Sequence, residues 1–112
     1  MTDLPPVSRD VILDIALPAV KPTARVEGRR ITMQPGVAGG RHVHNGPVFG
    51  VILEGSAVYE VEGGESRVLV PGDVFYEAED ATIARFDARD DGVVFIGYFL
   101  LGEGEEGIMS PL

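Results

Sequence analysis

The sequence contains no cysteine and no tryptophan, and only two of its 112 residues are histidine. Without cysteine the chain can form neither a disulfide framework nor a zinc–thiolate site, and it has no thiol nucleophile. No apolar run is long enough to cross a membrane, and the first residues carry no basic start followed by an apolar stretch. We therefore expect no membrane span and no signal peptide, and we predict a cytoplasmic protein.

Basic residues are also scarce, with 9 Lys and Arg against 18 Asp and Glu, so that the formal net charge is -9. A protein that neutralises phosphates needs a basic face, and we expect neither nucleic acid nor an anionic membrane as a partner. The glycine spacings of dinucleotide-binding and P-loop motifs are absent, and no serine has a histidine context typical of a nucleophile.

Glycine and proline are abundant, at 15 and 8 residues, in a chain whose hydrophobic content of 45% is ordinary for a folded domain. This richness indicates many turns, and no segment keeps a helical period for three turns. We predict one all-β domain over residues 1–112, built as a closed or sandwich-like barrel. The predicted strands are 11–17, 29–34, 48–53, 57–61, 67–70, 74–77, 82–87 and 93–101.

The two ends of the chain differ from its middle. Residues 11–17 could form a short helix or a strand, and the β-branched residues and the stop at Pro18 favour the strand. We therefore predict an N-terminal strand arm over 1–28, a barrel over about 29–101 and a flexible, solvated acidic tail over 102–112.

His42 and His44 are the residues most indicative of chemistry. On an extended backbone, residues i and i+2 point to the same face about 7 Å apart, so both imidazoles can reach one metal ion. The alternative is that two surface histidines beside a glycine-rich loop have no function.

The segments around these histidines resemble the cupin superfamily. Residues 40–55, GRHVHNGPVFGVILEG, are similar to its first conserved motif, and residues 71–77, PGDVFYE, are similar to the opening of its second. The resemblance covers about residues 29–101. It implies a small antiparallel β-barrel, the jelly-roll-like double-stranded β-helix, in which His42 and His44 face the interior as metal ligands.

The chain departs from the cupin pattern at two ligand positions. Val48 and Phe49 stand where the family commonly supplies a glutamate, and Ile83 stands where it supplies a third histidine. In the family's pattern Glu77 lies on a face that lines the barrel, where an ionised carboxylate is costly unless it is paired or bound to metal. Glu77 is therefore a candidate third ligand. The alternative is a strand register that turns Glu77 to solvent.

Two histidines and one carboxylate leave coordination positions open and suit Fe, Mn, Ni or Zn. Glu77 is also the one evident candidate for a catalytic base. Tyr59 and Arg85 are candidate substrate-binding residues. Tyr59 could instead be a core residue with a satisfied hydroxyl, and Arg85 could instead lie on the surface.

The resemblance implies a metal-binding cupin that acts as an oxygenase, isomerase or cyclase on a small organic molecule. The alternative function is a non-catalytic cupin that binds or senses a small ligand through an incomplete metal site. A homodimer is also expected, because the strand predicted over 11–17 has no assured partner in so small a barrel and cupins often pair through such strands.

Overall fold

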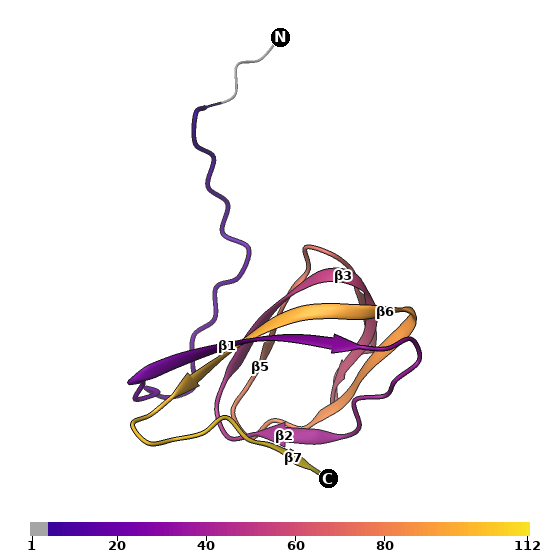
Figure 1. Cartoon of the computed structure of the whole chain (residues 1–112). Helices are drawn as coiled ribbons and strands as arrows, with labels where there is room; N and C mark the ends of the chain where they lie inside the picture. Colours follow the sequence, from indigo (N-terminus) through magenta and orange to yellow (C-terminus); the bar gives the residue numbers. More distant parts are fainter. Residues whose placement is uncertain (1–4) are drawn as a thin grey trace.

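The computed structural model describes residues 5–112 and contains seven strands and no helix in that part of the chain (Figure 1). Consequently no helix there is long and apolar enough to cross a membrane. All strand pairs are antiparallel, which confirms the predicted all-β barrel. The strands are β1 (Arg25–Met33), β2 (His42–His44), β3 (Val48–Val61), β4 (Arg67–Leu69), β5 (Val74–Glu77), β6 (Ile83–Leu101) and β7 (Met109–Pro111).

Two long strands, β3 and β6, organise the barrel. They pair with each other from Val48 opposite Phe99 to Val61 opposite Ile83. Strand β5 pairs with the beginning of β3 and β4 with its second half, while β1 pairs with the second half of β6. Each long strand therefore pairs with different short strands along its two halves, so β3 and β6 connect the short strands into one barrel (Figure 1).

The sequence predicted four strands where the structure has these two. Gly55 and Gly92, taken as strand ends, instead lie within β3 and β6 with φ of 72° and 68°. The β3–β6 ladder shifts register on both sides of Gly55, and a Cβ atom on Gly55 would overlap the Gly92 carbonyl oxygen. These glycines permit bulges at which the strands bend, so the ladder continues through the predicted turns.

An aromatic cluster fills much of the barrel interior. The rings of Phe75, Phe86 and Phe95 pack together with centroid separations of 4.6–5.9 Å, and Tyr59 packs against the first two. Such tilted and edge-on pairs stabilise a core beyond their area of contact. These contacts fix the positions of the aromatic rings that line the barrel interior.

The predicted strand over residues 11–17 is wrong. Residues 5–24 form no strand, and the Ala24 amide donates to the Leu101 carbonyl just before β1 begins. Residues 17–21 line a pocket together with Pro47, Tyr76 and Glu79 of the barrel, and in Figure 1 the chain before them runs away from it. An apolar, β-branched segment becomes a strand only when a neighbour pairs with its backbone, and no described strand lies beside this one. Residues 1–4 of the predicted arm lie outside the described residues.

The acidic C-terminal segment was predicted to be flexible and solvated. Most of its residues are exposed, but its backbone is tied to the barrel. Strand β7 pairs with β2, placing Met109 opposite His44. The Asn45 side chain donates to the Glu106 carbonyl at 2.7 Å and accepts from the Ile108 amide at 2.8 Å. Composition describes the solubility of this segment but not the partners of its backbone.

Candidate metal site

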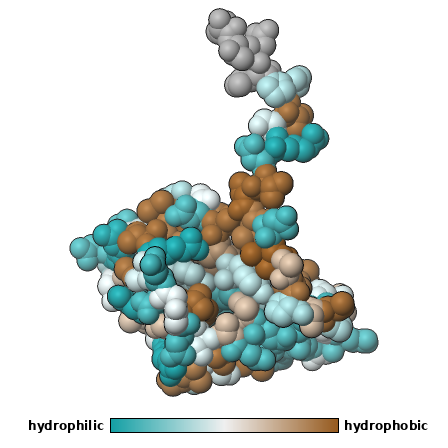
Figure 2. Space-filling view, turned by 180° about the vertical axis from the view of Figure 1, so that it is seen from behind, coloured by the Kyte–Doolittle hydropathy of each residue, from teal (hydrophilic) through white to brown (hydrophobic). Residues whose placement is uncertain are grey.

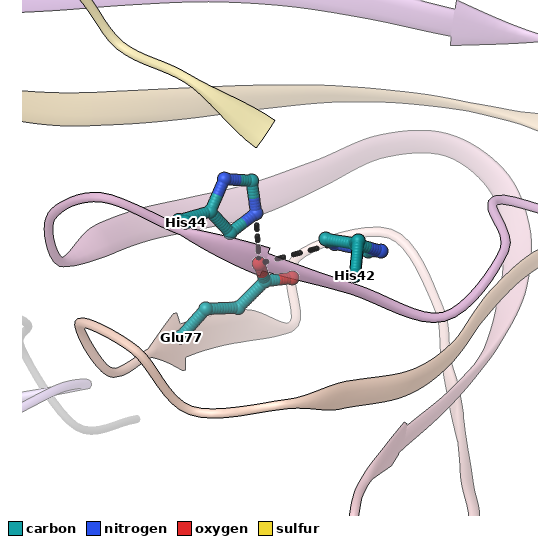
Figure 3. A group of neighbouring side chains, drawn as sticks. All are labelled: His42, His44 and Glu77. Carbon is teal, nitrogen blue, oxygen red and sulfur yellow. Dashed lines mark ion pairs between the residues drawn. The ribbon is translucent and has the colours of Figure 1, made fainter. Parts of the chain in front are cut away.

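Three buried side chains meet at one end of the barrel. His42 and His44 extend from the same face of β2, as the i, i+2 spacing predicts, and Glu77 extends from the end of β5 (Figure 3). Their exposed fractions are 5%, 8% and 4%, so the solvent-facing alternative for Glu77 does not occur. One potential ligand atom from each residue lies within 4.8 Å of the others. The three residues could therefore hold a metal ion.

The hydrogen bonds orient the imidazoles differently. Nδ1 of His42 lies 2.8 Å from the Gly40 carbonyl oxygen, and an Nδ1–H donated there leaves Nε2 unprotonated and directed toward Glu77. Nε2 of His44 lies 2.6 Å from Oε2 of Glu77, whereas its Nδ1 is buried without a hydrogen-bond partner. A buried polar atom of this kind is uncommon and points to a functional constraint. This donor set fits a transition metal.

The carboxylate of this cluster comes from β5. The position where cupins commonly supply a glutamate, Val48 or Phe49, lies in the neighbouring strand β3. Glu77 pairs directly with Val48 in the β3–β5 ladder. Directly opposed residues project from the same face with their Cβ atoms about 5 Å apart, so Glu77 reaches space that a glutamate at position 48 would reach. The second departure adds no further ligand, because Ile83 is fully buried and its direct partner in the ladder is His42, which is already one of the three residues.

The charges of the three side chains depend on one another. The Glu77 carboxylate raises the pKa of His42 above its ordinary 6.5, against the opposing effect of burial. Burial by itself would raise the pKa of Glu77, but the imidazoles of His42 and His44 outweigh it and hold that pKa below 4.5. Glu77 is therefore ionised at neutral pH, which is the form that binds a metal.

A cavity of about 300 Å³ adjoins the three residues. Its wall is apolar apart from His42, His44 and Glu77. The other lining residues are Ile31, Met33, Val37, Ala38, Gly39, Val48, Phe75, Phe86, Phe95, Gly97, Phe99 and Met109. Most of these were missed by sequence reasoning, although the apolar alternation of β6 could have indicated Phe95 and Phe99. No local signal indicates Met109, which the pairing of β7 with β2 brings to the cavity.

The two predicted substrate-binding residues do not line this cavity. The Tyr59 hydroxyl donates to the Tyr76 carbonyl at 3.1 Å, and burial raises the pKa of Tyr59. Arg85 is half-exposed and pairs with Asp87, with Nε 3.0 Å from Oδ2. The ladder skips from Arg85 to Ile83 at a register shift, so the two side chains do not share a face as strict alternation predicts. A role in substrate binding stays a prediction for both residues.

Comparisons with known proteins agree with this architecture. Residues 29–83 match the profile of the Cupin domain family, and no curated protein matches significantly. A structure of DMSP lyases aligns with a TM-score of 0.67 and 19% identity over 79% of this chain and 45% of that chain. An uncharacterised conserved protein with a double-stranded β-helix domain from Klebsiella pneumoniae aligns with a TM-score of 0.64 and 17% identity. The alignment covers 83% of this chain and 81% of that chain.

A third structure, a study of the Mn(II) centres of Bacillus subtilis oxalate decarboxylase, gives a TM-score of 0.63 and 23% identity over 78% of this chain and 24% of that chain. This chain thus spans less than half the length of the lyase and of the decarboxylase. At these identities the structural likeness shows the fold.

Proposed function

Because this chain carries a domain of the cupin superfamily, we propose that it is a metal-binding cupin that acts as an enzyme on a small organic molecule inside the barrel. The observation that carries the proposal is the convergence of His42, His44 and Glu77 at the wall of an apolar cavity. Three protein ligands leave coordination positions for water or substrate.

The proposed cofactor is a divalent transition metal, Fe, Mn, Ni or Zn, held by the two imidazoles and the carboxylate. When bound, it would supply Lewis-acid or redox chemistry. The Mn(II) centres named for the oxalate decarboxylase support a metal in this fold. Oxygenase, isomerase and cyclase chemistry all fit this donor set.

The chain's own side chains would position the substrate and move its protons. The phenylalanines of the cavity wall exclude water from the reacting end of a bound molecule. Glu77 is the one carboxylate that lines the cavity among the described residues. Any proton that a side chain removes there goes to a Glu77 oxygen or to an imidazole nitrogen.

Metal analysis tests this proposal. We expect protein prepared with Mn, Fe, Ni and Zn available to contain about one equivalent of metal, and His42→Ala to contain much less. Arg41→Ala is a matched control, because Arg41 precedes His42 and pairs with the exposed Glu62. Wild-type protein without metal, or an undiminished content in His42→Ala, would contradict the proposal.

The cavity also supports the second candidate, a cupin that binds or senses a small ligand without turnover. No titratable side chain besides the three proposed ligands lines the cavity in residues 5–112, so a separate general acid or base is lacking there. Conversion of any compound by the metal-loaded protein in a substrate screen, lost in Glu77→Gln, would exclude this second candidate.

We propose in addition that the chain forms a homodimer. The exposed fractions of Val11, Ile12 and Val20 are 83%, 70% and 92%. Figure 2 shows hydrophobic side chains along the N-terminal segment that extends from the barrel. Strand β1 pairs only with β6 among the described strands, so one of its edges is open to a second copy. Light scattering after size exclusion should report a dimer for the full chain and a monomer after deletion of residues 1–16. A monomeric full chain would refute the dimer without affecting the metal site.

A further inference from the structure

The cavity beside His42, His44 and Glu77 restricts the molecules that can occupy it. We infer that its ligand carries one metal-binding polar group at one end and an uncharged, apolar remainder, with about ten non-hydrogen atoms in all. The inference rests on the proposed function for the polar end, because that end would meet the metal. The apolar character of the remainder is inferred from the cavity walls alone and does not depend on a metal.

Apart from the three ligands, the walls of the cavity offer almost no polar partner. Aromatic faces and edges come from Phe75, Phe86, Phe95 and Phe99, and the other side chains are aliphatic or methionine. A hydroxyl or amide placed there would lose its hydrogen bonds with water and gain none in return. Methylene or ring carbons gain affinity from the same burial, about fourfold for each methylene.

A second anionic group would also lack a counter-charge. No lysine or arginine lines the cavity among the described residues. Arg29 stacks over the Phe99 ring, with Cζ 4.2 Å from the centroid, but its guanidinium already pairs with Glu27 and donates to the Gly107 carbonyl. A carboxylate buried without a partner costs enough to lower affinity about 100-fold or more. The ligand's single anionic or polar group must therefore lie at the metal end.

The volume of the cavity limits how much of a ligand can be buried in it. A cavity of about 300 Å³ equals roughly ten water volumes. Gly97 contributes to this space, because a Cβ there would meet Phe99 at 3.4 Å and Val48 at 3.5 Å, which is ordinary contact. Alanine at position 97 is therefore compatible with the fold but narrows the cavity.

Hydroxamates with matched heads and different tails test the inference. Zinc-loaded full-length protein is titrated by calorimetry with butanohydroxamate, hexanohydroxamate and adipic acid monohydroxamate. We expect hexanohydroxamate to bind roughly 16-fold more tightly than butanohydroxamate, at about fourfold for each added methylene. Adipic acid monohydroxamate, in which a carboxylate replaces the terminal methyl group of hexanohydroxamate, should bind at least about 100-fold more weakly than hexanohydroxamate. Gly97→Ala should weaken the hexanoyl compound more than the butanoyl compound.

Equal affinity for the charged and uncharged tails, or no gain with chain length, would overturn the inference. Zinc content and zinc-induced thermal stabilisation are measured first, without any hydroxamate, so failure of metal binding is recognised separately. In that case benzene binding to the metal-free protein still tests the apolar cavity, because a dry apolar cavity of smaller size binds benzene. Benzene binding supports the apolar walls, and its absence overturns them.

Discussion

Glu77→Gln separates the metal-binding role of the carboxylate from its role in packing. The amide has nearly the same shape as the carboxylate but carries no charge. In the structure Glu77 supplies the one anionic donor, and its Oε2 lies 2.6 Å from Nε2 of His44 and 3.8 Å from Nε2 of His42. The amide can still accept a hydrogen bond from His44, so we expect the metal-free variant to fold.

The expected magnitude follows from linkage between metal binding and unfolding. A metal at 100 times its dissociation constant stabilises the folded state by about 2.7 kcal/mol. For a domain of this size that corresponds to a rise in Tm of about 10 °C. Loss of a residue that only orients a metal ligand weakens binding by up to about 100-fold, and we expect loss of a direct ligand to weaken it at least as much. At the same metal concentration the variant then gains only about 0.4 kcal/mol, or about 2 °C.

Thermal unfolding followed by circular dichroism, with and without zinc, measures both shifts. Glu79→Gln is the matched control, because Glu79 is half-exposed, lies two residues away and contacts Lys21 rather than the histidines. We expect the control to keep the full zinc-induced rise. If Glu77→Gln kept it as well, the assignment of Glu77 as a ligand would be refuted.

Three further predictions concern pH, packing and the C-terminal segment. Zinc affinity should fall as pH decreases through the raised pKa of His42, so the loss begins above pH 6.5, and zinc titrations at several pH values measure it. In the metal-free protein the sign is opposite for that group: the stability His42 gains from Glu77 is fully present below pH 6.5 and is lost as pH rises through the folded pKa, which urea unfolding detects. Gly50→Ala should destabilise by about 1–3 kcal/mol in urea unfolding, because its Cβ would overlap the Phe75 ring. Asn45→Ala should speed amide hydrogen exchange in β7, because it removes both bonds that the Asn45 side chain makes to the segment, whereas unchanged exchange would contradict that role.

The candidate site was predictable because short-range geometry determines most of it. The i, i+2 spacing of His42 and His44 operates within a few residues. The inward direction of Glu77 was predicted from the resemblance of residues 71–77 to the second cupin motif. Alternation gave the wrong face for Arg85. A register shift between β3 and β6 lies between Arg85 and Ile83, so these two residues do not share a face. Such a bulge depends on the partner strand and is not encoded at one position.

The ends of the chain were predicted poorly for a related reason. Residues 11–17 have strand-forming composition but no described strand to pair with, whereas the glycine- and glutamate-rich tail finds a partner in β2. Pairing between segments far apart in sequence decides both outcomes, and local composition contains no information about it.

From the pairing of β2 we expect the two histidines to reach their positions late in folding. Their strand is one of the shortest, and its backbone partners are Ile83 in β6 and the three residues of β7. These partners are distant from β2 in the sequence. Closing the long loops between them costs chain entropy before any contact compensates it. A refolding chain would thus assemble the β3–β6 framework first and complete the His42–His44 strand only when β7 docks, so metal capture would report a late step of folding.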